Sequence, residues 1–418
     1  MLKFWQQKGS SQMKLAKILL GSAVVIGSMA GVAHAEDARV HIILCGDDTW
    51  GGAVNDAHMG EWEAANPGFK TDIEYVPWGQ CQEKATTLAA AGNPAAIAYM
   101  GSRTLKQLAA NDLILSHDLT ADELASYAAP ILGTVTADGK VWGLPRAFST
   151  KALYWNKDLF SAAGLDPEAG PTTWSEMLDA ATAVKEKTDA DGFGLAAASF
   201  DNTMHQFMNY IYTNGGEVIN ADGDIVFNSP NNVEALEFYG KTLAAVSQPG
   251  PVAYDRAKLR PLFVESKIGM FVSGPWERNA VGDAVNWGVT SMPAGPSGGP
   301  GTLLITDSYA VFKNSGVEEA ALSLAKYMTS PDKQMEFEIA AGLTPLRPDH
   351  AEVAKMRAED PTWGAFLDAI PTGGPEPFVT DYVGLQDVIN EAIQAVVLGE
   401  ATAADAVAEA AEALEEYK

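Results

Sequence analysis

Apolar and polar residues alternate beyond residue 36 in a pattern that predicts strands separated by helices. A continuous apolar run at residues 40–44 predicts a strand buried on both faces. Residues 71–75 alternate apolar and acidic positions, which predicts a second strand, and residues 95–100 predict a third. Helical stretches ending near residues 66–68 and at Gly92 separate them. Repeated strand–helix units imply a parallel sheet, whose ligand sites lie beyond the carboxyl ends of its strands.

A second α/β unit is predicted in the middle of the chain. Its helix starts are marked by two capping boxes and by two serines that precede a proline, namely Thr173 with Glu176, Ser315 with Glu318, Ser229–Pro230 and Ser330–Pro331. Short strands at residues 268–272 and 287–290 interleave with these helices. The pattern at residues 380–417 is helical again and ends in an acidic, alanine-rich helix after Gly399, which we expect to pack with its acidic face in solvent.

The first 35 residues have the pattern of a secretion signal. Four lysines and no acidic residue lead into an apolar run at residues 18–32, which closes on Ala33-His34-Ala35. The run is too short and too rich in Gly and Ser for a membrane span, and no cysteine follows the cleavage site for lipid attachment. We therefore expect cleavage after Ala35 and export to the periplasm, with Met13 an equally good start codon.

The remaining chain is long enough for two domains and strongly acidic. About 383 residues exceed one ordinary hydrophobic core. Removing the leader leaves 24 basic and 54 acidic residues, a net charge of −30. That charge argues against nucleic-acid and anionic-lipid partners, because both are bound by concentrated Lys and Arg.

The two cysteines of the chain are expected to form a disulfide. Cys45 ends the first predicted strand and Cys81 follows the second, so both fall at the same sheet edge if those strands are neighbours. An oxidising periplasm favours the bond. The alternative is a free cleft cysteine that acts as an enzymatic nucleophile.

The other motifs of catalytic or metal chemistry are incomplete. Residues 295–299 match the nucleophile-elbow pattern, but Pro300 and Gly301 follow where the elbow needs a helix. Residues 189–192 open like a calcium loop, but Phe200 stands where the loop requires glutamate. Neither metal-binding histidine spacing nor a phosphate-binding loop occurs. We therefore expect a binding protein without catalytic residues, cofactor or metal.

Several ordered segments resemble the extracellular solute-binding proteins of carbohydrate importers, of which the maltose-binding protein is the best-known member. They are WEAANPGFKTDIEYV at residues 62–76, AAAGNPA at 89–95, LYWNKD at 153–158, GMFVSGPW at 269–276, SPDKQ at 330–334 and TPLR at 344–347. The resemblance covers essentially the whole chain after the leader. It departs from the maltose-binding pattern at residues 146–150, where Arg-Ala-Phe-Ser-Thr replaces a stretch with an acidic ligand residue.

This resemblance implies an α/β, two-lobe periplasmic binding protein fold (type II), with two domains joined by three hinge crossovers. By analogy, the N-terminal lobe takes residues 36–147 and 303–343, and the C-terminal lobe takes residues 148–302 and 344–418. Hinge closure around a solute is the mechanism of periplasmic binding proteins. The implied partners are a small carbohydrate or derivative and the permease subunits of an ABC transporter, with the chain itself a monomer.

A sugar site needs aromatic platforms and rigid polar groups. Trp276, after the predicted strand at residues 268–272, is similar to the family's stacking tryptophan, and Trp50 and Trp78 lie in strand-end loops. The polar candidates also lie at strand ends or crossovers: Asp47, Asp48, Thr49, Gln80, Ser102, Arg103, Arg146, Arg278, Asp307 and Arg347. For each, the alternative is a surface or hinge salt bridge.

The position of four arginines leaves the charge of the ligand open. Arg103, Arg146, Arg278 and Arg347 all fall in strand-end or crossover segments, and a guanidinium fork can bind a carboxylate, sulfonate or phosphate. The ligand is therefore expected to be a sugar or sugar derivative, with an anionic one as a possibility. A chemosensory ligand-binding protein of the same fold is the other non-enzymatic alternative.

Overall fold

The larger sheet of the protein contains the three strands predicted near the start of the chain. The computed structural model describes residues 37–220 and 222–417, so the predicted leader and its cleavage site lie outside the described residues. The six strands of this sheet are β1 (Ala38–Cys45), β2 (Phe69–Val76), β3 (Ile97–Gly101), β6 (Leu144–Ser149), β10 (Leu303–Val311) and β11 (Gly374–Pro375). Val40 and residues 42–44 of β1 are buried, as a strand covered on both faces requires, whereas His41 within the run is partly exposed.

The strand order brings distant parts of the chain to one sheet edge. β1 pairs in parallel with β2 and β3, which confirms the predicted parallel arrangement. β10 runs antiparallel between β3 and β6. In this register Asp307 lies opposite Gly101 on one side and Ala147 on the other. A residue from late in the chain is thereby fixed beside the carboxyl end of β3.

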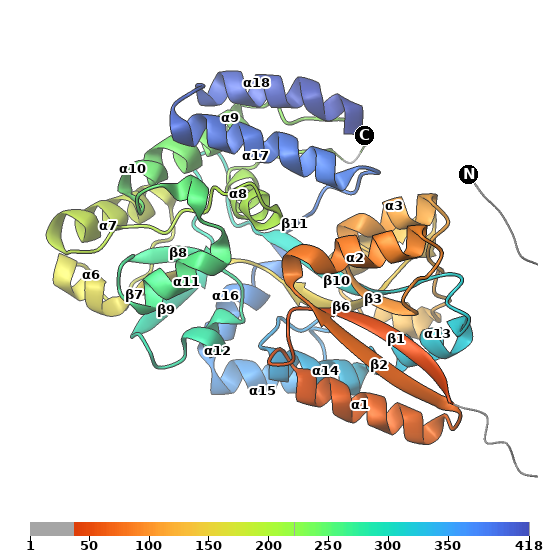
Figure 1. The fold of residues 1–418 in the computed structure, drawn as a ribbon. Helices are drawn as coiled ribbons and strands as arrows, with labels where there is room; N and C mark the ends of the chain where they lie inside the picture. Colours follow the sequence, from red (N-terminus) through yellow and green to blue (C-terminus); the bar gives the residue numbers. More distant parts are fainter. Residues whose placement is uncertain (1–36, 221, 418) are drawn as a thin grey trace, which may run out of the picture. The chain divides into compact units, whose positions relative to one another are not determined.

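Helices cover both faces of this sheet. In Figure 1, α2 lies on one face, whereas α1 and α14 lie on the other. The helices of this part of the chain are α1 (Gly52–Ala65), α2 (Trp78–Ala90), α3 (Leu105–Ala110), α4 (Ala121–Ala125), α5 (Ala129–Gly133), α13 (Glu318–Met328) and α14 (Pro331–Ala341). A two-stranded hairpin of β4 (Thr136–Ala137) and β5 (Lys140–Val141) precedes β6.

A second, smaller sheet has β7 (Ala152–Asn156) at its centre. β8 (Met270–Ser273) and β9 (Trp287–Ser291) flank it, both antiparallel to β7. The sequence predicted β8 and β9 but gave no sign of their direction. The helices of this region are α6 (Lys157–Ala163), α7 (Trp174–Lys187), α8 (Asp201–Thr213), α9 (Pro230–Glu237), α10 (Ala244–Val246), α11 (Arg256–Val264), α12 (Glu277–Val281), α15 (Ala351–Glu359) and α16 (Gly364–Leu367).

Two of the four predicted helix caps form as expected. Thr173 and Glu176 make the reciprocal capping box of α7, and Ser229 accepts a hydrogen bond from the amide of Asn232 at the start of α9. Ser330 precedes α14, but its hydroxyl donates to the carbonyl of Tyr327 instead of capping the helix. The box predicted for Ser315 and Glu318 is wrong, because α13 begins only at Glu318 and Val317 occupies the cap position.

The C-terminal region forms two packed helices, as predicted. α17 (Tyr382–Leu398) ends at Gly399 in the left-handed conformation, and α18 (Ala403–Leu414) follows. Figure 1 shows the two lying side by side, with α9 next to α18. Buried residues of α18 recur at helical spacing, so its acidic residues face solvent. Within residues 37–220 and 222–417, no helix combines the length and apolar character needed to cross a bilayer.

Apolar side chains gather in three clusters. One surrounds the larger sheet and draws on residues 40–147 and 309–343, and a second surrounds β7 and β8 and extends to α17 and α18. A third draws on residues 127–154, 196–285 and 304–370 and so takes members from both regions. Because this cluster is shared, the lobe boundaries given above stay a prediction.

Candidate functional site

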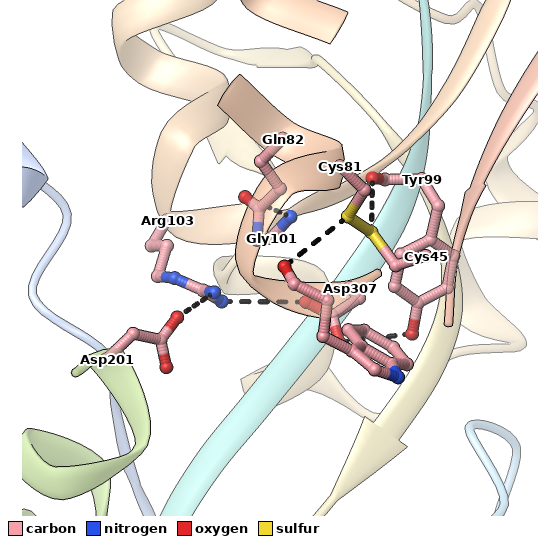
Figure 2. The surroundings of a disulfide bond; sticks show 9 residues. Cys45, Cys81, Gln82, Tyr99, Gly101, Arg103, Asp201 and Asp307 are labelled. Atoms are coloured by element: carbon pink, nitrogen blue, oxygen red, sulfur yellow. Dashed lines mark hydrogen bonds and ion pairs between the residues drawn. A yellow bond between two sulfur atoms is a disulfide. The ribbon is translucent and has the colours of Figure 1, made fainter. Parts of the chain in front are cut away.

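The carboxyl ends of β1 and β2 are tied together by a disulfide. Cys45, the last residue of β1, is bonded to Cys81 in α2, with the two Cα atoms 5.4 Å apart (Figure 2). The predicted bond is therefore present. A bonded cysteine supplies no thiolate, so the hypothesis of a cysteine nucleophile is not favoured.

Three aromatic side chains pack edge to face beside this disulfide. The ring of Trp50 lies 5.4 Å from that of Trp78 and 5.7 Å from that of Tyr99, and Trp78 lies 5.5 Å from Tyr99. Trp78 nevertheless leaves 46% of its surface exposed. Edge-to-face packing fixes the rings and leaves part of the surface of Trp78 open to solvent.

Arg103 is the centre of a buried ionic cluster. Only 7% of the residue is exposed, and its guanidinium forms ion pairs with Asp201, with Asp307 at 3.5 Å and with Glu376 at 3.3 Å. Figure 2 shows Asp201 and Asp307 on either side of the guanidinium. Burial alone would lower the pKa of Arg103, but Asp201 and Glu376 outweigh it and raise the pKa.

The cluster joins elements that are far apart in the sequence. Arg103 lies in a 3₁₀ turn after β3, Asp307 in β10 and Asp201 at the start of α8, whereas Glu376 follows β11. Burial raises the pKa of Asp307 to about 6, although Arg103 opposes the effect. Asp307 also accepts a hydrogen bond from the hydroxyl of Tyr99 at 3.1 Å, which links the ionic cluster to the aromatic one.

His205 connects two of these carboxylates from its position in α8. Its Nδ1 lies 3.1 Å from Asp201 and its Nε2 lies 2.6 Å from Glu376. The Tyr382 hydroxyl lies 2.9 Å from the same Nε2 and donates to Glu376 at 3.2 Å. Burial would raise the pKa of Glu376, but Arg103 and His205 lower it, so the carboxylate is held in its ionised form.

Trp276 lies in a second group of charged residues. The Lys151 Nζ atom is 4.8 Å and the Arg256 Cζ atom 4.7 Å from the centroid of its ring. Its indole N–H donates to Glu277 at 3.1 Å. Glu277 is completely buried and also pairs with Arg256 and Arg260. Trp276 is thus held in a fixed orientation by its own neighbour in the chain.

A groove of about 780 Å³ adjoins the ionic cluster. Arg103 and Glu376 contribute to its wall, together with Tyr212 and with residues 215–220 and 372–378. A groove of this volume accommodates a small solute. The groove, which is large enough for a small solute, therefore borders the buried ionic cluster at Arg103.

Three predicted arginines have partners away from this cluster. Arg146 is fully buried and donates to the Met328 carbonyl, to Gln334 and to Asn55. Arg278 donates to Thr362 and Asp360, and Arg347 donates to Ser126 and to the Thr329 carbonyl. Each also stacks on an aromatic ring, as Arg146 does on Phe337. Of the four arginines behind the anionic-ligand argument, only Arg103 lies in the ionic cluster.

The remaining predicted polar residues are not part of the ionic cluster. Asp47, Asp48 and Thr49 are exposed, and Asp47 accepts hydrogen bonds from the amide and hydroxyl of Thr49. Gln80 is exposed in the first turn of α2. Ser102 is buried and shares a hydrogen bond of 2.9 Å with Ser308.

Seven charged residues of the two groups were missed by the sequence analysis: Lys151, Asp201, His205, Arg256, Arg260, Glu277 and Glu376. Asp201 and His205 lie in a helix, and Glu376 lies in a proline-rich stretch, so no strand-end rule selects them. Lys151 follows β6 at the predicted first crossover, where the sequence did offer a signal. Among the described residues, no cluster suited to a metal ion is present.

Comparison with known proteins identifies the family. The family model of the bacterial extracellular solute-binding proteins matches residues 47–335. A putative binding protein of Brucella abortus (strain 2308) is 28% identical over 391 residues, which cover 92% of this chain and 93% of the relative. The galactooligosaccharide-binding protein of Bacillus subtilis (strain 168) is 25% identical over 302 residues, covering 70% and 69%.

Solved structures show the same fold. A solute-binding protein of an ABC transporter from Thermotoga lettingae TMO, bound with alpha-D-tagatose, has a TM-score of 0.80 at 24% identity, covering 91% of this chain and 99% of its own. Maltose-bound MalE3 of T. maritima has a TM-score of 0.79 at 24% identity, covering 91% and 99%. The predicted two-lobe fold is confirmed. Because the family model matches more than half of its length, this chain belongs to the bacterial extracellular solute-binding proteins.

Proposed function

We propose that this protein is the substrate-binding subunit of an ABC-type importer and captures a sugar or sugar derivative between its two lobes by hinge closure. The solute would lie beside Arg103, with Trp78 and Trp276 offering aromatic surfaces and with Asp307 and Glu376 as acceptors of hydroxyl groups. Arg103 carries the proposal, because one buried side chain there pairs with acids from three separate elements.

The chemistry of the site suits a polyhydroxylated solute. Charged donors and acceptors make stronger hydrogen bonds to hydroxyl groups than neutral ones do. Aromatic rings complement the apolar face of a sugar ring. The groove of about 780 Å³ adjoins Arg103, although Trp78 and Trp276 are not among the residues that line it. The edge-to-face packing of Trp50, Trp78 and Tyr99 holds one such surface rigid before the solute arrives.

The names of similar proteins support a saccharide or polyol. Besides the tagatose and maltose complexes, a ribitol complex from Agrobacterium radiobacter K84 has a TM-score of 0.72 at 22% identity, covering 91% of this chain and 99% of its own. The family and the similar proteins are binding proteins, which supports a role without catalysis.

Delivery to a membrane permease completes the proposed role. In this role the leader is cleaved after Ala35, and the mature chain acts as a monomer in the periplasm. Closure around the solute creates the surface that the permease recognises. The disulfide supports this location, because such bonds persist in oxidising compartments.

The proposal is tested by thermal-shift screening of the mature chain, residues 36–418, against maltose, D-tagatose, ribitol, D-galactose and D-glucuronate. A solute that binds the folded state raises the melting temperature by mass action, and calorimetry then gives its Kd. Small-angle scattering with and without that solute measures closure.

Two single variants connect the binding to the site. Trp276→Ala and Trp78→Ala should each raise the Kd about tenfold or more, because loss of an aromatic contact costs about 1.4 kcal/mol. Trp363→Ala is the matched control, since Trp363 is buried against Arg278 and Phe366 outside the ionic cluster. If every saccharide and polyol left the melting temperature unchanged, the proposed function would be wrong.

A further inference from the structure

Lys151 lies at the meeting point of two crossovers. It directly follows Thr150 after β6 and precedes β7, so it belongs to the first predicted crossover. Its amide donates to the hydroxyl of Thr302 at 2.9 Å, and that hydroxyl lies 3.3 Å from the Lys151 carbonyl. Thr302 precedes β10 in the second crossover. The backbone of Lys151 is therefore fixed where the two predicted crossovers meet.

The ammonium group of Lys151 is buried with donors to spare. Only 3% of the residue is exposed. Its Nζ atom donates one hydrogen bond, to Ser149 at 2.9 Å, and lies 4.8 Å from the ring centroid of Trp276. An ammonium has three N–H groups, so two of them have no oxygen partner within the described residues. Leaving such donors unmatched in the interior is unfavourable.

The nearby acids are already engaged by other groups. Asp201, Asp307 and Glu376 each pair with Arg103, and none of them lies within 4.0 Å of the Lys151 ammonium. Burial, followed by repulsion from Arg256, lowers the pKa of Lys151 to about 7. A lysine in a purely structural ion pair would have the opposite shift. The two remaining N–H groups of the Lys151 ammonium can therefore donate to an acceptor from outside the protein.

We propose that Lys151 is a specificity-determining residue of the solute site, where its ammonium donates hydrogen bonds to oxygen atoms of a solute that lies against Trp276. This inference rests on the proposed function and adds to it the residue that selects the solute. Because the Lys151 backbone is anchored at the crossovers, its position changes little as the lobes close, and it binds the solute in the open as well as the closed form.

Charge balance then defines which solutes Lys151 admits. The two charged groups contain four carboxylates, Asp201, Asp307, Glu277 and Glu376. They also contain four basic groups, Arg103, Lys151, Arg256 and Arg260, besides His205. With Lys151 protonated, the four basic groups other than His205 balance the four carboxylates, so an uncharged solute needs no further counter-charge there. A carboxylate on the solute would add an unmatched buried charge, and the site should reject it.

Binding through the ammonium makes affinity depend on pH. The groups around Lys151 that carry or can change charge are Arg256 in α11, Asp201 and His205 in α8, Asp307 in β10, Glu277 in α12, Arg103 after β3 and Glu376 after β11. Of these, Asp307 has a pKa of about 6 and is ionised above pH 7. Loss of affinity between pH 7 and 9 therefore reports Lys151, because a solute that accepts from the ammonium binds only its protonated form.

The test uses calorimetry on the mature chain, with the neutral probe from maltose, D-tagatose, ribitol and D-galactose that binds most tightly. Lys151→Met should raise its Kd about tenfold or more at pH 7, whereas Lys355→Met, which changes a lysine exposed over 61% of its side chain, should leave it unchanged. The Kd of the unaltered protein should rise at least about fivefold from pH 7 to 9, and that of Lys151→Met should not. D-galacturonate should bind at least about tenfold more weakly than D-galactose, and maltobionate more weakly than maltose.

The outcomes separate this inference from the proposed function. If a neutral probe binds and Lys151→Met matches the unaltered protein in both Kd and pH profile, Lys151 does not contact the solute, although the proposed function stands. Tighter binding of D-galacturonate than of D-galactose would overturn the charge-balance argument. If no probe binds the unaltered protein, the proposed function itself is wrong, and the inference is lost with it.

Discussion

Replacing Lys151 by methionine should stabilise the protein, and by an amount that depends on pH. Methionine has a similar length but no charge, so it removes a buried ammonium while it keeps most of the packing against Trp276. The ordinary pKa of 10.5 falls to about 7 in the folded chain. Between these values the unfolded chain binds the proton and the folded chain loses it, so the free energy of unfolding rises with pH.

The size of the effect follows from that pKa difference. At about 1.36 kcal/mol per pH unit, the buried ammonium costs about 4 kcal/mol at pH 7 and about 2 kcal/mol at pH 9. Lys151→Met should therefore be more stable than the unaltered protein by amounts that differ by about 2 kcal/mol between these two pH values. Differences in packing do not change with pH, so they cancel in this comparison.

The measurement is unfolding in urea at pH 7, 8 and 9, monitored by tryptophan fluorescence. Lys355→Met is the control, because its exposed ion pair with Glu352 contributes at most about 1 kcal/mol and should not vary over this range. If the stability gain of Lys151→Met were the same at pH 7 and pH 9, Lys151 would not titrate in this window, and the reasoning from its burial would be refuted.

Three further predictions follow from buried or bonded side chains. Arg103→Ala should lower the free energy of unfolding at pH 7 by about 3–5 kcal/mol, because three acids lose their cation, and Arg103→Lys should lose less; urea unfolding measures both. Reduction of the Cys45–Cys81 bond, which spans 36 positions, should cost about 4 kcal/mol, measured with and without a phosphine reductant. Burial raises the pKa of Glu338 to about 7, so stability falls as pH rises from 4.5 to 7; Glu338→Gln should add about 3 kcal/mol at pH 8 and little at pH 4.5.

The local sequence pattern predicted three of the six strands of the larger sheet, β1, β2 and β3, but not β6, β10 or β11. An apolar run predicts a strand that is buried on both faces, and alternation predicts one that is buried on one face. This prediction for β1 does not depend on knowing which strands pair with it. The disulfide was predictable for a related reason. Cys45 and Cys81 follow consecutive parallel strands, and consecutive strands in such units are usually neighbours.

The site was predicted only in part, because only some of its residues lie at strand ends. Arg103 and Trp276 were found because they follow predicted strands, and Asp307 because it lies in a predicted crossover; all three lie in the charged groups. Arg146 and Arg347 satisfied the same rule but donate to carbonyl and polar groups outside the ionic cluster. The position of a residue near a strand end does not determine the direction in which its side chain points.

Local patterns in the sequence were enough to predict β1, β2, β3, β8, β9, the two C-terminal helices, the acidic charge, the pairing of the cysteines and the family. Each of these depends on neighbours along the chain or on composition. In contrast, the three-dimensional packing alone brings Asp201, Glu376 and Lys151 to Arg103 and Trp276 in the two charged groups. Their positions depend on β10 returning beside β3 and on the packing of α8, contacts between residues separated by many positions that no local pattern records.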